Sequence, residues 1–272
     1  MLQYSSSWLY SPPTVFSHLP GQEASIQQLI DLHCHIVPGV DDGPATWEES
    51  TQLFSQMKEQ MTRPAVLVAT PHFRLSTSGR VFSSQSKRIL EFLSFANRLR
   101  IEDEFSVLAA REVMLDRWKP SANALDVLCL PGTSWVLVEH SFNMPWIFAL
   151  LRIRAVLKQG FKPLLAHPER YSWCRTRPER IGRLSEMGVG IQVCAKSLTG
   201  AGATDETAWR LIETGMVHVL SSDAHHPGDN LLSEELKHEV DRVSPGAYNL
   251  LTGKMPEMVL NNCELPKLPL MT

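Results

Sequence analysis

The sequence predicts an α/β fold in which a parallel sheet of about seven strands is covered by helices and closes into a barrel. From residue 28 onward, short apolar runs alternate with helical stretches, which is the pattern of parallel sheets. The chain of 272 residues has no low-complexity linker in its interior that would separate two domains. A single barrel therefore suits its length better. Spacing alone favours closure of the sheet without proving it.

The predicted strands are apolar along their bodies and short, as buried parallel strands are. They cover residues 29–35, 65–72, 105–114, 135–141, 162–170, 189–195 and 216–225. The intervening stretches carry helical signals, such as Trp47, Phe54 and Met57 on one face of the first. The predicted helices cover residues 47–61, 83–100, 146–160, 176–187, 204–215 and 231–243. Capping-box patterns open two of them, Thr46 with Glu49 and Thr176 with Glu179.

Residues 1–27 are rich in Ser and Pro and are expected to form an extended or disordered arm, outside a barrel of residues 28–272. No stretch has the pattern of a signal peptide or the length of an apolar membrane span. The five cysteines are odd in number and scattered, which indicates reduced thiols and a cytoplasmic location. The net charge is −3 and no basic run is present, so nucleic acid is not an expected partner.

Residues that can bind metal follow most of the predicted strands. A single histidine at a strand end is usually structural, but here about six of the seven strands end with a His, Asp or Glu. In α/β barrels the carboxyl ends of the strands carry the reacting groups. The candidate ligands, in chain order, are His33, His35, Asp42, His72, Glu112, Glu139, His167, Asp223 and His225. The sequence therefore predicts a metal site at this end of the barrel.

The spacing and chemistry of these residues indicate more than one ion. Residues i and i+2 of a strand point to one side, so His33 with His35 and Asp223 with His225 can each grip one ion. Imidazole and carboxylate ligands without thiolate suit Mn, Fe or Zn. Three divalent ions would bring a formal charge of about +6 against about −4 from the carboxylates, leaving a positive site for a phosphate dianion.

These motifs resemble the polymerase-and-histidinol-phosphatase (PHP) superfamily. The resemblance lies in DLHCHIVPGVDDGP, ATPHF, AREV, LVEHS, LAHPERY and SSDAH, and it covers roughly residues 30–262. Within the superfamily, DDGP and HPERY are most similar to the bacterial manganese-dependent tyrosine-protein phosphatases of capsule and exopolysaccharide gene clusters. The resemblance implies the PHP fold, a distorted TIM-like (β/α)7 barrel, and a centre of three divalent ions, with Mn²⁺ expected and Fe or Zn possible.

The resemblance also implies ligand sets for the three ions. The first would be held by His33, His35, Glu112 and Asp223, the second by Glu112, Glu139 and His167, and the third by Asp42, His72 and His225. Relatives carry an Arg a few residues after the final His, whereas this chain continues His226-Pro227-Gly228-Asp229-Asn230. This departure concerns the binding of phosphate more than the binding of metal.

The implied activity is hydrolysis of phosphotyrosine on a protein, expected to be an autophosphorylating tyrosine kinase that controls polysaccharide export. Arg170, His225 and Asp42 are expected to act in catalysis. Arg170, Arg74 and Phe73 are expected to contact the substrate, the first two as cations for the phosphate and the third as part of an aromatic rim.

Other interpretations remain beside this one. A PHP-family enzyme acting on a small phosphate ester such as histidinol phosphate would share the metals and differ only at the rim. A catalytically impaired metal-binding homologue would fit the missing Arg. The C-x5-R spacing from Cys174 to Arg180 imitates a cysteine phosphatase, but Pro178 lacks the N–H that such a phosphate loop requires.

Overall fold

The computed structural model describes residues 28–61, 64–74, 79–98, 105–116, 128–200, 202–229 and 231–269, so the predicted arm of residues 1–27 lies outside the described part. The strands are β1 (Leu29–Cys34), β2 (Ala65–Ala69), β3 (His72–Arg74), β4 (Phe105–Ala109), β5 (Glu112–Met114), β6 (Trp135–Glu139), β7 (Lys162–Ala166), β8 (Gly190–Cys194) and β9 (Val219–Ser221). Every pairing between them is parallel, as the alternating sequence pattern predicts.

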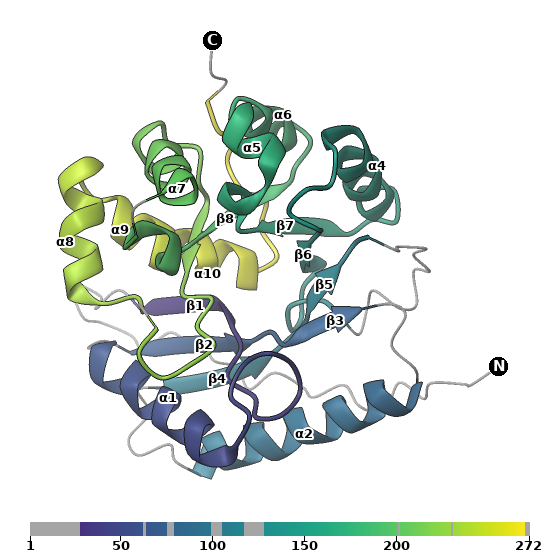
Figure 1. The fold of residues 1–272 in the computed structure, drawn as a ribbon, viewed down its shortest axis with the longest axis vertical. Coiled ribbons are helices and arrows are strands. Elements are labelled where there is room, and N and C mark those ends of the chain that lie inside the picture. The colour runs from purple at the N-terminus through teal and green to yellow at the C-terminus, as the bar shows by residue number, and fades with distance from the viewer. Residues whose placement is uncertain are drawn as a thin grey trace.

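Helices surround these strands on the outside (Figure 1). The longer ones are α1 (Trp47–Gln60), α2 (Gly79–Arg98), α4 (Trp146–Leu157), α7 (Ala203–Glu213) and α8 (Glu234–Val243). The shorter ones are η1 (Pro168–Arg170), α5 (Ser172–Thr176), α6 (Arg180–Glu186), η2 (Ala195–Leu198), α9 (Ala247–Asn249), η3 (Leu250–Lys254) and α10 (Met255–Leu260). None of the described helices combines the length and hydropathy needed to cross a bilayer.

The strands form two sheets, not one continuous barrel. The first has the order β1-β2-β4 and the second the order β3-β5-β6-β7-β8-β9. The predicted strands 65–72 and 105–114 each break into two short strands that belong to different sheets, β2 with β3 and β4 with β5. Pro71 lies at the first break and lacks the N–H that would continue the ladder.

The two sheets nevertheless follow a barrel-like course. Across the breaks, the Ala110 amide donates to Ala69 O (2.9 Å) and the Glu112 amide donates to Pro71 O (3.3 Å). At the other side, β1 and β9 meet through the parallel bridge between Cys34 and Ala224. The expectation that the first and last strands lie side by side is therefore confirmed, although only one bridge joins them.

The hydrophobic core has an outer and an inner part. Strand β6 shows both, because Val136 and Val138 pack in the large cluster that includes helix side chains, whereas Trp135 and Leu137 pack in a smaller cluster of mainly strand residues. Glu139 has the same parity as Trp135 and Leu137, so it continues the inner face. This alternation carries a carboxylate from the apolar interior to the mouth of the barrel.

Local capping confirms one predicted helix start and corrects another. Thr46 Oγ1 accepts from the Glu49 amide (3.2 Å), and Glu49 Oε2 accepts from the Ala45 amide (2.7 Å), so α1 begins with a reciprocal cap. The predicted helix over 176–187 has the wrong start, because Thr176 ends α5 and its hydroxyl donates to Ser172 O (2.9 Å). The chain then turns at Pro178, and α6 starts separately.

A segment that we call the C-terminal strap, residues 261–268, crosses several elements and is fixed to them by hydrogen bonds. The Trp135 indole donates to Cys263 O (3.1 Å), and the Lys267 ammonium donates to Ser185 O (3.0 Å). The Leu268 amide donates to Ser185 Oγ (2.8 Å). The strap thereby links β6 and α6.

Candidate metal centre

The predicted ligands converge at the carboxyl ends of the parallel strands. His33 lies in β1, His35 follows that strand, and Glu139 ends β6. The breaks in the sheet place His72 and Glu112 as the first residues of β3 and β5, directly opposite each other in register. The other members follow their strands, namely His167 after β7 and Asp223 and His225 after β9. All nine predicted ligands thus lie at one mouth of the fold.

Two of these residues adopt an unusual backbone conformation. His167 has φ 36° and Asp223 has φ 54°, both in the left-handed region that residues other than glycine seldom occupy. Each follows a strand at the point where the chain turns. Such strained conformations persist only where the surrounding structure holds them in place, and they cluster at functional sites.

The first cluster contains His33, His35 and Asp223, all buried. The Nε2 atoms of the two histidines lie 3.0 Å apart, and Asp223 Oδ1 lies 3.2 Å from the first and 3.5 Å from the second. The Nδ1 atom of His33 donates to Gln192 Oε1 (3.0 Å), and that of His35 donates to Asp41 Oδ2 (2.7 Å). In neutral imidazoles both Nε2 lone pairs then face one another, an arrangement that a cation between them would stabilise.

Glu112 lies at the centre of the site. Its Oε2 atom is 3.4 Å from His33 Nε2, 3.3 Å from His35 Nε2 and 2.8 Å from His72 Nδ1. Its Oε1 atom is 2.8 Å from His167 Nε2. Burial alone would raise the pKa of Glu112, but the imidazoles of His33 and His167 lower it well below its usual range, so the group is a carboxylate. A carboxylate with histidines on both oxygens can bridge two ions.

The second cluster contains His72, Glu112 and Glu139. His72 Nδ1 lies 2.8 Å from Glu112 Oε2 and 2.9 Å from Glu139 Oε1. These three buried atoms are close together, yet none forms an aligned hydrogen bond. Buried polar atoms are normally hydrogen-bonded, so the unsatisfied set fits a divalent cation. His167 approaches the same cluster, with its Nε2 atom 3.9 Å from Glu139 Oε2.

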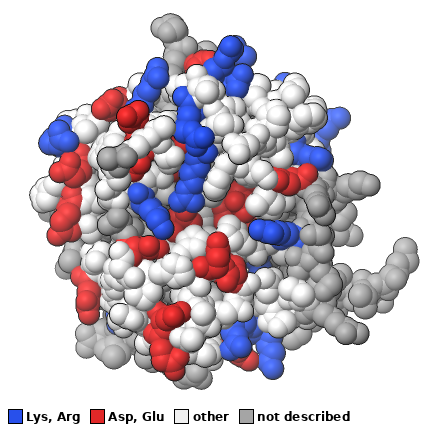
Figure 2. All heavy atoms as spheres, in the orientation of Figure 1, with Lys and Arg blue, Asp and Glu red and all other residues white. Residues whose placement is uncertain are grey.

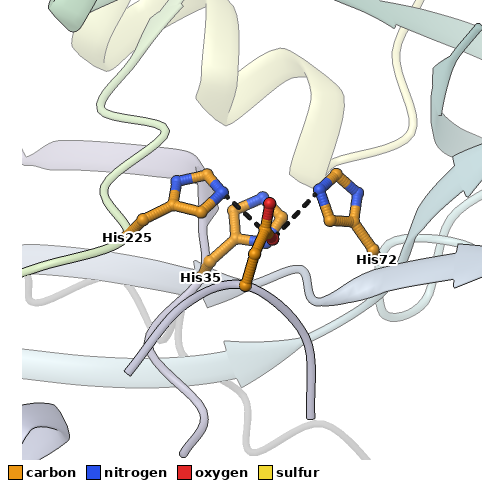
Figure 3. Close-up of side chains that lie close together, drawn as sticks. His35, His72 and His225 are labelled. Atoms are coloured by element: carbon orange, nitrogen blue, oxygen red, sulfur yellow. Dashed lines mark ion pairs between the residues drawn. The ribbon is translucent and has the colours of Figure 1, made fainter. Parts of the chain in front are cut away.

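The third cluster is the most open and contains His35, Asp42, His72 and His225. Figure 3 shows His72 and His225 on either side of the carboxylate, with the two dashed ion pairs converging on it. Asp42 Oδ1 lies 3.3 Å from His72 Nε2 and 3.5 Å from His225 Nε2, while its side chain is 69% exposed. Substrate therefore has access to the site from this side.

The charge of the cluster favours bound cations. Burial lowers the pKa of His35, but the nearby carboxylates of Asp41 and Glu112 outweigh this effect and raise the pKa to about 10. For His72, burial is outweighed in the same way by Glu112 and Glu139, and the pKa rises to about 11. The carboxylates hence attract positive charge strongly enough to protonate buried imidazoles, and divalent ions would satisfy the same field.

Neighbouring polar residues orient the candidate ligands. Asp41 Oδ2 accepts from His35 Nδ1. Asp31 acts on the backbone, because its Oδ1 atom accepts from the amides of His33 and Ser222 (both 3.1 Å). Gln192, whose Oε1 accepts from His33, was missed by sequence reasoning. The available signal was a polar residue within the otherwise apolar run 189–195.

The proposed substrate contacts have different surroundings. Arg170 Nη2 lies 2.6 Å from Asp223 Oδ2, so its guanidinium is at the site. Arg74 ends β3 and is exposed near the same mouth. The Phe73 ring is only 8% exposed and packs in the hydrophobic core, which does not suit contact with a substrate. Phe142, by contrast, is 46% exposed and stands edge-on to His167 at 5.9 Å between ring centroids.

The competing motif of Cys174 and Arg180 does not form a phosphate loop. Cys174 is buried within α5, and burial raises the pKa of its thiol above the usual range. The nearby His140 is also not a ligand candidate, since its Nε2 atom lies 3.3 Å from the Trp173 indole nitrogen and its ring stacks on Tyr171. Both residues therefore belong to the packing around the site.

Comparison with known proteins bears on the same candidate metal centre. The described residues form a barrel-like parallel α/β fold with a candidate metal centre of histidines and carboxylates at its strand ends. The family model described as "Capsular polysaccharide synthesis, CpsB/CapC" matches residues 29–237, so the chain belongs to this family.

Several members of the family are similar over most of their length. Tyrosine-protein phosphatase YwqE of Bacillus subtilis is 26% identical over 243 residues, which are 87% of this chain and 91% of the relative. Tyrosine-protein phosphatase CpsB of Streptococcus agalactiae is 28% identical, covering 73% and 83%. A solved structure described as belonging to "unique metal-dependent tyrosine phosphatases", from work on YwqE and Streptococcus pneumoniae CpsB, has a TM-score of 0.73 at 23% identity. It covers 90% of this chain and 100% of that one.

Proposed function

We propose that this chain is a metal-dependent phosphomonoesterase that hydrolyses phosphotyrosine on proteins. The observation that carries the proposal is the convergence of buried histidines and carboxylates around Glu112, which has both oxygens facing imidazoles. Family membership adds support, because the relatives described above are tyrosine-protein phosphatases.

The residues present suit three divalent cations. By the resemblance, His33, His35, Glu112 and Asp223 would hold the first ion; Glu112, Glu139 and His167 the second; and Asp42, His72 and His225 the third. The geometric clusters support this assignment with two differences: His72 lies with Glu112 and Glu139, and His35 is close enough to join the third set. When bound, such ions lower the pKa of water and neutralise charge on a phosphoryl group. We expect Mn²⁺, while Fe or Zn would accept the same ligands.

The protein groups at the open side would handle the phosphoryl group and the leaving phenol. Arg170 presents a planar guanidinium that can donate two hydrogen bonds to phosphate oxygens, and its pairing with Asp223 fixes it at the site. His225 Nδ1 donates to Asp223 O (2.8 Å), which orients the ring toward Asp42. A phenol has a pKa of about 10, so the leaving group needs less protonation than an alkoxide. We assign catalytic roles at this side to His225 and Asp42, which would help to hold the third ion.

The physiological substrate class follows from the family. We propose a tyrosine-phosphorylated protein, expected to be an autophosphorylating tyrosine kinase of capsule or exopolysaccharide synthesis. Residues 28–272 would form one catalytic unit in the cytoplasm. The thiols of Cys34, Cys129, Cys174, Cys194 and Cys263 form no disulfide, in keeping with a reducing compartment.

The decisive experiment couples metal analysis to turnover. Purified protein is stripped with a chelator, reloaded separately with Mn²⁺, Fe²⁺ or Zn²⁺, and assayed on a phosphotyrosine peptide and on histidinol phosphate. We expect the metal-loaded wild type to turn over the peptide. In Glu112→Ala, turnover should fall about 100-fold or more, and the protein should also lose bound metal. Glu239→Ala, which changes an exposed carboxylate of α8, is the matched control.

Each other result has a meaning. Preference for histidinol phosphate would favour the enzyme of small phosphate esters. Inactivity of protein that binds every metal tested would favour the impaired homologue. A Glu112→Ala variant that remained active without metal would contradict the proposed centre altogether.

A further inference from the structure

Four arginines gather beside the candidate site on α5 and α6 and on the turn between them. We call Arg175, Arg177, Arg180 and Arg183 the arginine ridge. Three of them are exposed and Arg180 is half-buried. Figure 2 shows basic side chains gathered along the upper middle of the molecule, in the region where Figure 1 places α5 and α6. The protein as a whole has a net charge of −3, so this positive surface is a local feature.

One end of the ridge lies next to the candidate metal centre. Arg175 Nη1 donates to the backbone oxygen of Arg170 (2.6 Å). Arg170 Nη2 in turn lies 2.6 Å from Asp223 Oδ2, within the first cluster of candidate ligands. Arg175 is therefore one residue removed from the candidate site.

Among the described residues, none of the four ridge arginines forms an ion pair within 4 Å. The carboxylate of Glu179, between Arg177 and Arg180 in the sequence, acts on Arg180 without such a contact. Other basic residues of the surface are paired, as Lys162 is with Glu264 (2.8 Å) and Lys237 with Glu234 (2.9 Å).

The guanidinium groups of the ridge also repel one another. Burial lowers the pKa of Arg180, and the charges of Arg177 and Arg183 lower it further, although the carboxylate of Glu179 partly offsets them. Arg180 is held in place over the Trp146 ring, with 5.2 Å from its central carbon to the ring centroid. Like charges kept together and unpaired at the edge of a site would be stabilised by an anionic partner.

We propose that the arginine ridge docks an acidic, Asp- or Glu-rich segment of the phosphoprotein substrate that flanks its phosphotyrosine. This inference rests on the proposed function and adds a determinant of substrate choice. Guanidinium forks match carboxylates in a bidentate manner. The seven residues of α6 span about 10 Å, or about three residues of an extended peptide, so several acidic side chains can be contacted at once.

The test compares two phosphotyrosine peptides of equal length, one with Glu-rich and one with Gln-rich flanks, and p-nitrophenyl phosphate as a substrate without flanks. We expect metal-loaded wild type to favour the Glu-rich peptide through a lower KM, with the preference fading at high salt. In R177Q/R183Q the kcat/KM for that peptide should fall about 3- to 10-fold. Turnover of the Gln-rich peptide and of p-nitrophenyl phosphate should remain at the wild-type level.

The matched control is K87Q/R242Q, which removes the same charge from exposed positions on α2 and α8 and should keep the preference. An absent preference in wild type, or an unchanged one in R177Q/R183Q, would overturn the docking role while p-nitrophenyl phosphate turnover still upheld the phosphatase. Absence of turnover of all three substrates would instead contradict the proposed function. The ridge could instead bind a membrane. In that case wild type would bind anionic vesicles, R177Q/R183Q would not, and the peptide preference would be the same in both. That result would likewise refute the inference.

Discussion

At the scale of single residues, the site depends on groups that touch no metal themselves. Gln192 lies in the middle of β8 and its Oε1 atom accepts from His33 Nδ1 at 3.0 Å. This hydrogen bond fixes the proton on Nδ1 and leaves Nε2 facing His35 and Glu112. Partners of this kind set the tautomer and orientation of ligand histidines.

Replacing Gln192 by Leu should weaken metal binding. The variant keeps a similar volume but removes the acceptor, so the His33 ring loses its orientation, and we expect metal affinity to fall about 10- to 100-fold. Competition with a metal-binding dye measures the affinity directly. Gln192→Glu retains an oxygen acceptor and should recover most of the affinity, whereas equal loss in both variants would argue for a packing role only.

The convergence of the candidate ligands could be predicted because they follow a rule about strand ends. His33, Glu139 and His167 each finish an apolar run, and the carboxyl ends of parallel strands meet at one edge. Gln192 could not be found in this way, since it lies inside a strand and glutamine is not a typical ligand for these metals. Phe73 illustrates the reverse error, because proximity in sequence to His72 does not reveal that strand alternation turns its ring into the core.

At the scale of elements, the loop between β1 and α1 positions several site residues at once. Asp41 Oδ2 accepts from His35 Nδ1 and from the His72 amide (3.0 Å), while Asp41 Oδ1 accepts from the Gly43 amide (3.1 Å). The loop is packed so closely that a Cβ atom on Gly43 would lie 2.3 Å from His35 O. Only glycine fits there without movement of the backbone.

Gly43→Ala should therefore damage the site through the loop. The clash lies with a backbone oxygen, so Asp41 and Asp42 must shift, and we expect kcat/KM to fall at least about 10-fold with a stability cost of about 1–3 kcal/mol. Steady-state kinetics and thermal unfolding of the metal-loaded protein measure both effects. Gly202→Ala, where the nearest atom would be 3.6 Å away, should resemble wild type; full activity in Gly43→Ala would contradict this account.

Element boundaries were the least predictable part of the fold. The alternation of apolar runs correctly predicted parallel strands, but not that two of them break, since the break at Pro71 depends on how neighbouring strands pair. The same limit applies to α6, whose start was predicted four residues too early, and to the short helix α5, which was not predicted. The C-terminal helices α9 and α10 were not predicted, because they are only 3 and 6 residues long.

At the scale of the whole molecule, the C-terminal strap connects distant elements through a buried histidine. His218 Nδ1 accepts from the Ile191 amide (3.0 Å), and its Nε2 donates to Pro266 O (2.8 Å). This pattern requires a neutral ring, and burial lowers the pKa of His218 to about 4. Protonation would remove the only lone pair that can accept from Ile191.

Stability should decline as acid is added, in part because of this residue. The folded pKa of about 4 lies below the usual value of about 6.5, so the unfolded chain binds the proton first and the free energy of unfolding falls as pH drops between these values. The contribution has a maximum slope of about 1.4 kcal/mol per pH unit. Urea unfolding from pH 7 to pH 5 should show a shallower decline in His218→Gln than in wild type.

The exposed His238 on α8 supplies the control for this measurement. His238→Gln should keep the wild-type dependence on pH. Identical slopes for wild type and His218→Gln would show that the hydrogen bonds to the strap do not couple stability to protonation.

Closure of the molecule was predicted only in part. Adjacency of the first and last strands followed from the number of repeats, and the bridge between Cys34 and Ala224 bears it out. The division into two sheets and the course of the strap could not be predicted from local pattern, because both depend on contacts between residues far apart in the chain.

The strap also has a consequence for biosynthesis. Residues 261–268 leave the ribosome after every element that they touch, including β6, α6 and the start of β9. Until they emerge, the indole of Trp135 and the Nε2 donor of His218 lack their native acceptors. The native contacts of the strap can therefore form only after translation has passed residue 268. A nascent chain halted before the strap would leave these groups without their partners and available to chaperones.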